Sequence, residues 1–139
     1  MIYMKKMLNE LMLKEYDALN ELIVLLEKQY NLCINENAFE LEAVAKDIEK
    51  SSITIGKYEL ERRELTGSKS VKLIIEELND KELNDNFLKL KNIILKVKSQ
   101  NEINQSLLKR RLMFTNKVLR IFNPDRGAKV YNNYGKVNK

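Results

Sequence analysis

The chain has 139 residues and a mass of 16.4 kDa, enough for a single domain with a thin core. Apolar residues make up 44% of the sequence and charged residues 32%, a composition that excludes disorder throughout. The 25 basic and 20 acidic side chains leave a formal charge of +5, which indicates a mixed surface rather than the clustered basic face of a nucleic-acid-binding protein.

The glycine, proline and cysteine content indicates the fold class and the cellular compartment. Four glycines and one proline are too few to separate the short strands of a sandwich or barrel, so the sequence predicts an all-α fold. The single cysteine, Cys33, cannot form an internal disulfide, and we expect a reducing cytoplasm. The sequence contains no run of about 18 apolar residues, the length needed to span a membrane. Acidic residues follow the first Met/Leu pairs too closely for a signal peptide.

Residues 3–33 are predicted to form one amphipathic helix. Its apolar positions repeat with the spacing of a heptad seam, which Leu11 and Ile23 widen. Two polar residues, Glu15 and Gln29, interrupt the seam. The apolar seam comprises Leu8, Met12, Leu19, Leu22, Leu26 and Cys33.

A second helix is predicted from about Ala38 to Leu65. Asn37, with Glu40 three residues later, fits a capping box at its start, and Gly67 fits its end. The central SSITIGKYEL could pass for a strand by itself, but the three-four seam runs through it in phase. That seam comprises Leu41, Val44, Ile48, Ser51, Ile55, Tyr58, Arg62 and Leu65.

The segment SVKLIIEEL is predicted either as a short helix or as the first turns of the next one. A long helix then runs from about Lys81 to Phe122 and ends before Pro124. Asn101 and Asn104 hold consecutive seam positions, where polar side chains fix the register of a bundle. The full seam comprises Leu83, Phe87, Leu90, Ile94, Val97, Asn101, Asn104, Leu108, Arg111, Thr115, Val118 and Phe122.

Three long helices with seams spaced near 3.5 residues predict an elongated antiparallel three-helix bundle with coiled-coil-like packing. We expect the bundle to span residues 1–122 and a short flexible recognition tail to span 123–139. The last third of the third long helix carries more apolar residues than one seam requires, because Leu107, Leu112, Phe114, Leu119 and Ile121 lie off it. Such a helix contacts both neighbouring helices, forms a homodimer, or opens as a groove for an amphipathic partner helix.

No catalytic residue, metal or cofactor is predicted. The chain has no His, no Cys/His cluster and no Gly-rich phosphate loop. A small helical mutase would need arginines converging from several helices, and no arginine precedes Arg62. An enzyme is therefore not expected.

The order of several segments resembles the flagellar export chaperone family FlgN over nearly the whole chain. These are EYDALNELIVLLEKQ in the first helix, LERREL before Gly67, NEINQSLL in the last helix and a Tyr-x-x-x-Gly element near the end. The resemblance implies a non-enzymatic cytoplasmic chaperone of flagellar type III secretion. Such chaperones bind the C-terminal helical segments of the hook–filament junction proteins FlgK and FlgL, prevent their premature assembly and deliver them to the export apparatus.

The resemblance also implies roles for individual residues. Asn101 and Asn104 match the family's Asn-x-x-Asn and take a structural role, while Tyr131 would contact the export-gate protein FlhA, with Tyr134 as the alternative. The substrate-protein-binding surface would comprise Leu107, Leu108, Leu112, Val118, Leu119 and Phe122.

Other functions fit the same helical pattern. A different helical secretion chaperone or adaptor for filament or cap subunits would have the same helices, and the seams also suit a self-associating structural coiled coil. The pI of about 9.2 leaves nucleic-acid binding as a further class to test, although none is expected. The oligomeric state, monomer or homodimer, is not determined by the pattern.

Overall fold

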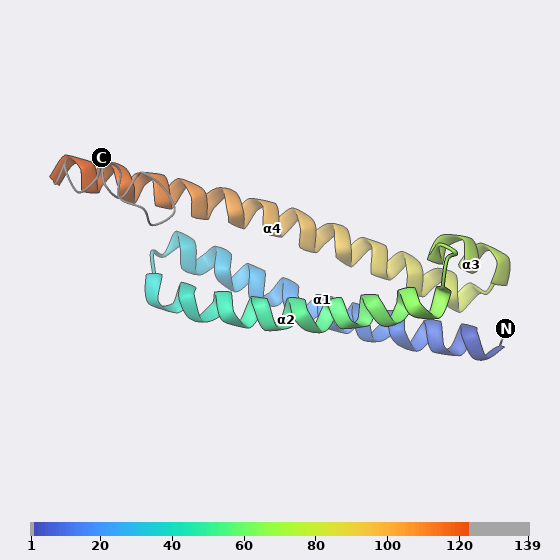
Figure 1. The fold of residues 1–139 in the computed structure, drawn as a ribbon. Helices are drawn as coiled ribbons and strands as arrows, with labels where there is room; N and C mark the ends of the chain where they lie inside the picture. The colour runs from blue at the N-terminus through green and yellow to red at the C-terminus, as the bar shows by residue number, and fades with distance from the viewer. Residues whose placement is uncertain (1, 123–139) are drawn as a thin grey trace. The chain divides into compact units, whose positions relative to one another are not determined.

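The structure, a computed structural model, describes residues 2–122 and contains four helices: α1 (Ile2–Ile34), α2 (Ala38–Thr66), α3 (Val71–Leu78) and α4 (Lys81–Phe122) (Figure 1). Within these residues no strand occurs, and the all-α prediction is confirmed. By its internal contacts the chain divides into a first unit, Met1–Glu102, and a second unit, Ile103–Lys139. The predicted tail, residues 123–139, lies outside the described residues.

The predicted boundary of α2 depends on two caps that the structure contains. The Asn37 side chain accepts a hydrogen bond from the Glu40 backbone N–H at 3.1 Å, which satisfies one of the free donors of the first turn. At the other end Gly67 adopts a φ of 65°, and its N–H donates to the Arg63 carbonyl at 2.9 Å. The helix passes through SSITIGKYEL without a break, so the seam outweighs the weak helix propensity of that stretch.

The segment SVKLIIEEL forms a short helix of its own. The Ser70 hydroxyl caps α3 by accepting from the Leu73 N–H at 3.2 Å, and Asn79 ends it in the left-handed conformation. Ile74 and Ile75 are buried on this helix and join the core of the first unit. The bundle therefore has three long helices and one short one.

The core of the first unit confirms the first two predicted seams. α1 and α2 lie side by side and antiparallel, joined by a turn at residues 35–37 (Figure 1). Every predicted apolar seam residue of α1 is buried, and so are the polar interruptions Glu15 and Gln29. Every predicted seam residue of α2 is buried or half-buried. The main cluster comprises Leu8, Met12, Leu19, Leu22, Ile23, Leu26, Ile74, Ile75, Leu83, Leu90 and Ile93.

The buried face of α4 departs from the predicted seam at alternate positions. Leu83 and Leu90 are buried as predicted, but the positions between and after them are filled by Asn86 and Ile93, whereas Ile94 is exposed. Phe87 is half-buried against the core. At the first of these positions an apolar pattern favours Phe87, but the polar Asn86 packs inward through a hydrogen bond. At the second position Ile93 and Ile94 are both apolar, so the pattern does not distinguish them.

Candidate protein-binding surface

The predicted binding surface lies on residues 103–122, the part of α4 that belongs to the second unit. Leu112 is 62% exposed and Leu119 36% exposed, whereas Leu107 and Leu108 are half-buried. The side chains of the other two predicted members, Val118 and Phe122, lie outside the described part of the chain. The predicted surface is therefore accessible at Leu112 and Leu119.

Further apolar side chains of this segment are exposed although the prediction of binding residues did not include them. Met113 and Phe114 are 63% and 67% exposed, and Ile103 and Ile121 are also exposed. Phe114 and Ile121 had a signal in the sequence, because they lie off the seam on an already apolar helix. Large apolar side chains gathered on one segment are typical of protein-binding sites.

Two of these residues, Met113 and Phe114, share a hollow of about 370 Å³ with basic side chains. Arg110, Met113, Phe114 and Lys117 follow the i, i+3, i+4, i+7 spacing, which places them on one face of the helix. Together they make a surface with an apolar centre and a cation on each side. We call it the basic hollow; its described lining comprises Arg110, Met113, Phe114, Asn116, Lys117 and Arg120.

The charge of the chain is concentrated in the second unit. Residues 1–102 carry 16 basic and 19 acidic side chains, a net charge of −3, whereas residues 103–139 carry nine basic and one acidic, a net charge of +8. Within residues 103–122 no acid occurs beside the five basic residues. The expectation of an evenly mixed surface is therefore wrong, because the total over the whole chain conceals two segments of opposite sign.

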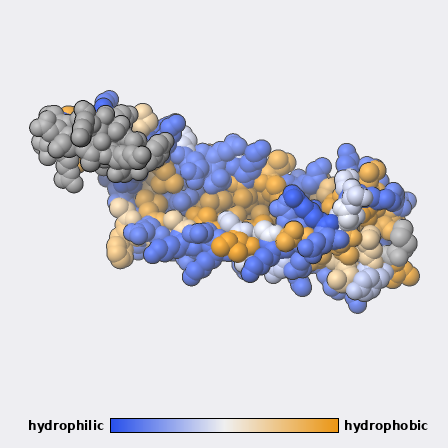
Figure 2. All heavy atoms as spheres, in the orientation of Figure 1, coloured by the Kyte–Doolittle hydropathy of each residue, from blue (hydrophilic) through white to orange (hydrophobic). Residues whose placement is uncertain are grey.

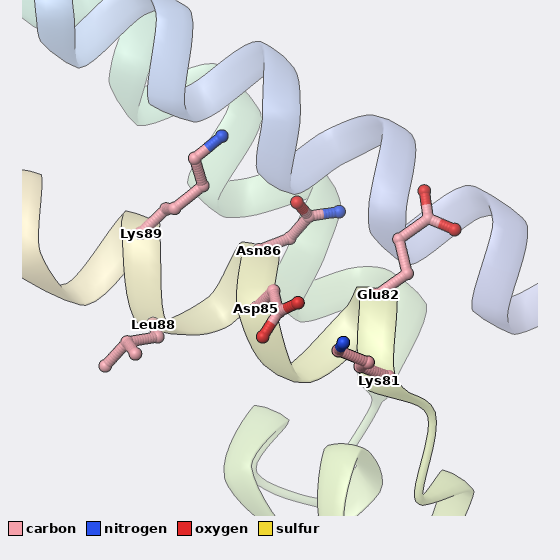
Figure 3. Close-up of a pocket in the computed structure, with 6 residues that line it drawn as sticks. All are labelled: Lys81, Glu82, Asp85, Asn86, Leu88 and Lys89. Atoms are coloured by element: carbon pink, nitrogen blue, oxygen red, sulfur yellow. The ribbon is translucent and has the colours of Figure 1, made fainter.

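A second hollow, of about 700 Å³, lies beside the first turns of α4 in the first unit (Figure 3). Glu82, Asn86 and Lys89 point from α4 toward α1 in this view. Asn86 donates to the buried Asn9 of α1 at 2.9 Å, and the Lys89 ammonium lies 5.2 Å from the centre of the Tyr16 ring. Asn86 and Lys89 thus hold α4 against α1.

Among residues 2–122 no cluster of three or more potential ligands could hold a metal ion.

The surface of α2 contrasts with the end of α4. Its visible face is mostly hydrophilic, with isolated apolar side chains (Figure 2). Ile53 and Leu60 are exposed on α2, but Lys57, Glu59 and Glu61 alternate with them. Single exposed apolar residues of this kind are ordinary on folded proteins.

A model of the FlgN protein family matches residues 1–139, the whole length of the chain. The chain belongs to the FlgN family. The resemblance drawn from its segments is therefore confirmed, and with it the assignment to flagellar export chaperones and flagellum biogenesis. FlgN proteins bind flagellar subunits and form a chaperone family rather than an enzyme family. Searches of curated proteins and of solved structures found no match.

The remaining residues assigned through the FlgN family differ in where they lie. Asn104 is buried, with 1% of its surface exposed, whereas Asn101 is exposed and its neighbour Gln100 is half-buried. Tyr131 and the alternative Tyr134 lie outside the described residues. The structural role of Asn101 and Asn104 stays a prediction.

No helix in the described part is both long and apolar enough to cross a bilayer.

Proposed function

We propose that this FlgN protein acts in the cytoplasm and binds the C-terminal helical segments of the hook–filament junction proteins FlgK and FlgL. It prevents their premature assembly and delivers them to the export apparatus. The observation that carries the proposal is the group of exposed apolar side chains at residues 103–122 in a chain that matches the FlgN family along its whole length.

The binding mode follows from amphipathic helix packing. A junction-protein segment that assembles outside the cell carries an apolar stripe, and covering this stripe with another helix removes the surface that drives aggregation. Full burial of a leucine contributes roughly 1.5–3 kcal/mol, so Leu112 and Leu119 together could supply several kcal/mol. Ordering of the guest segment opposes this gain, which moderates the affinity and permits release at the export apparatus.

Delivery is assigned to the tail. Tyr131 offers apolar area and one hydroxyl, a combination suited to a small recognition contact, and we propose that it contacts FlhA. Tyr131→Ala should leave binding of the junction segments unchanged and reduce their export. The matched control is Tyr134→Ala, which should leave both unchanged. Loss of segment binding in Tyr131→Ala would contradict a role confined to delivery.

Co-purification of the full chain with the C-terminal segments of FlgK and FlgL tests the binding site. Leu112→Asp/Leu119→Asp should abolish capture while the far-ultraviolet circular dichroism stays helical. A matched control is Ile53→Asp/Leu60→Asp on α2, which has the same seven-residue spacing and native side chains 55% and 58% exposed. The control should retain capture, and equal loss in both variants would place the binding site elsewhere.

Two outcomes would replace this function with a different one. Capture of a filament or cap subunit, but of neither junction protein, would make the chain a secretion chaperone for those subunits. A concentration-dependent rise in sedimentation coefficient that Leu112→Asp/Leu119→Asp removes would assign the exposed residues to self-association instead.

A further inference from the structure

We infer that the basic hollow of α4 recognises an amphipathic helix whose apolar stripe is bordered by acidic side chains. The inference rests on the proposed function and extends it to a second face of α4, because Met113 and Phe114 lie on the side of the helix away from Leu112 and Leu119. It is based on four residues: the exposed cations Arg110 and Lys117, and the apolar pair Met113 and Phe114 between them.

The spacing on α4 determines what can dock. Arg110 and Lys117 are seven residues apart, about two helical turns or 10 Å along the axis. Met113 and Phe114 lie one turn from each cation on the same face. A guest helix that packs its apolar stripe on Met113 and Phe114 therefore brings its bordering side chains, also about two turns apart, close to both cations.

Charge complementarity selects the sign of those bordering residues. No acid occurs within residues 103–122, so this segment offers no carboxylate of its own to Arg110 or Lys117. Glutamates or aspartates on the guest would supply this charge, whereas lysines in the same places would be repelled. The apolar contacts provide affinity, and the cations determine which amphipathic helices are accepted and how they are oriented.

An anionic membrane is the alternative with the same electrostatic attraction. Helices that lie in a bilayer interface separate an apolar face from a polar face that carries the cations. On α4 the cations Arg110 and Lys117 instead share one face with Met113 and Phe114, and the exposed Leu112 and Leu119 lie on another part of the circumference. This mixed arrangement favours a narrow apolar stripe with charged borders, which is the surface of an amphipathic protein helix.

Fluorescence anisotropy of two labelled 21-residue peptides tests the inference on the full chain. Both peptides carry the same leucine stripe, bordered by glutamate in one and by glutamine in the other. Two exposed ion pairs predict roughly five- to tenfold tighter binding of the glutamate peptide at low salt. The preference should fall toward unity as ionic strength rises and the Debye length shortens.

Charge-reversal variants test whether Arg110 and Lys117 cause the preference for the glutamate peptide. Arg110→Glu/Lys117→Glu should remove it, or reverse it, while the glutamine peptide still binds. Lys50→Glu/Lys57→Glu is the matched control, because two exposed lysines on α2 have the same spacing and undergo the same change of charge. Equal affinity for both peptides, or equal loss in the control, would overturn the inference. Tighter binding to phosphatidylglycerol vesicles than to the glutamate peptide would overturn it in favour of a membrane.

The native segments separate failure of this inference from failure of the proposed function. If FlgK and FlgL segments are captured but show no dependence on Arg110 and Lys117, the chaperone function stands and acidic recognition is wrong. If neither the native segments nor the glutamate peptide binds, both are wrong.

Discussion

The first unit and the end of α4 both expose large apolar side chains, but they differ in their charge and in the pairing of their polar side chains. In the first unit, polar residues that enter the seams are paired: Arg62 donates to Glu15 at 3.1 Å, and Asn86 donates to Asn9 at 2.9 Å. At residues 103–122 large apolar side chains are exposed beside cations, with no acid in the same segment.

This difference separates residues that hold a fold from residues suited to binding. A buried polar group without a partner would destabilise the fold, so the first unit satisfies each one that interrupts its seams. Exposed apolar area contributes nothing to folding until something covers it. Changes in the first unit should therefore alter the free energy of unfolding, and changes at residues 103–122 should alter binding.

The largest expected effect comes from truncating a core leucine. Leu83→Ala removes a fully buried side chain and should lower the free energy of unfolding by about 2–5 kcal/mol in urea denaturation. Leu112→Ala makes the same change at an exposed position and should alter it by no more than about 0.5 kcal/mol. Similar losses in the two variants would contradict the contrast between the regions.

Breaking the ion pair between α1 and α2 should lower the free energy of unfolding somewhat less than Leu83→Ala does. Arg62→Met leaves the carboxylate of Glu15, only 3% exposed, without its partner, so we expect a loss of about 3 kcal/mol. The neighbouring Arg63→Met removes an exposed pair with Glu59 and should cost less than about 1 kcal/mol. Glu15→Met/Arg62→Met should recover most of the loss, and a double variant as unstable as Arg62→Met would contradict this account.

A smaller effect is expected from the amide pair between α1 and α4. Asn86→Ala leaves the buried Asn9 side chain without its hydrogen bond and should lower the free energy of unfolding by about 1–2 kcal/mol. Asn92→Ala, at an exposed position of the same helix, is the control and should be nearly neutral. Thermal and urea denaturation check both, and equal effects would mean that the hydrogen bond does not stabilise the bundle.

The smallest effect concerns the start of α4 at low pH. The pKa of the Asp80 carboxyl lies below its ordinary value of 3.8 because the Leu83 N–H donates to it at 3.0 Å, and the Lys5 ammonium adds to this at 3.3 Å. A lowered pKa in the folded state means that ionised Asp80 stabilises the fold above about pH 4 and loses this contribution as the pH falls further. The stability difference between the native chain and Asp80→Asn should therefore shrink from pH 6 to pH 3.

Lys5→Met sharpens this test, because it retains the hydrogen bond from the Leu83 N–H to Asp80. The Lys5→Met variant should therefore remain more stable than Asp80→Asn at pH 6, by most of the margin of the native chain. A difference that stays constant from pH 6 to pH 3 would show that the charge of Asp80 does not stabilise the fold.

Local patterns made much of the fold predictable. Asn37 with Glu40 and the glycine at position 67 marked the ends of α2 because caps act over one helical turn. The seams of α1 and α2 were predictable because the two helices bury a continuous stripe against each other. On α4 the apolar pattern misplaced alternate positions, since the burial of Asn86 depends on Asn9, 77 residues away in the sequence.

The candidate surface was predictable only in part. Leu112 and Leu119 stood out because an amphipathic helix needs fewer apolar residues than this segment has. The basic hollow was not predicted, because the total charge of the chain conceals the excess of cations at the end of α4. Exposed fractions also depend on what each residue packs against, and the spacing of Leu107 and Leu112 alone does not distinguish a half-buried side chain from an exposed one.

Amide hydrogen exchange of the full chain, with and without the C-terminal segment of FlgK, tests the central claim most directly. We predict that the segment slows exchange in residues 103–122 and leaves the core helices α1 and α2 nearly unchanged. Protection confined to α1 and α2, with none in residues 103–122, would contradict the account.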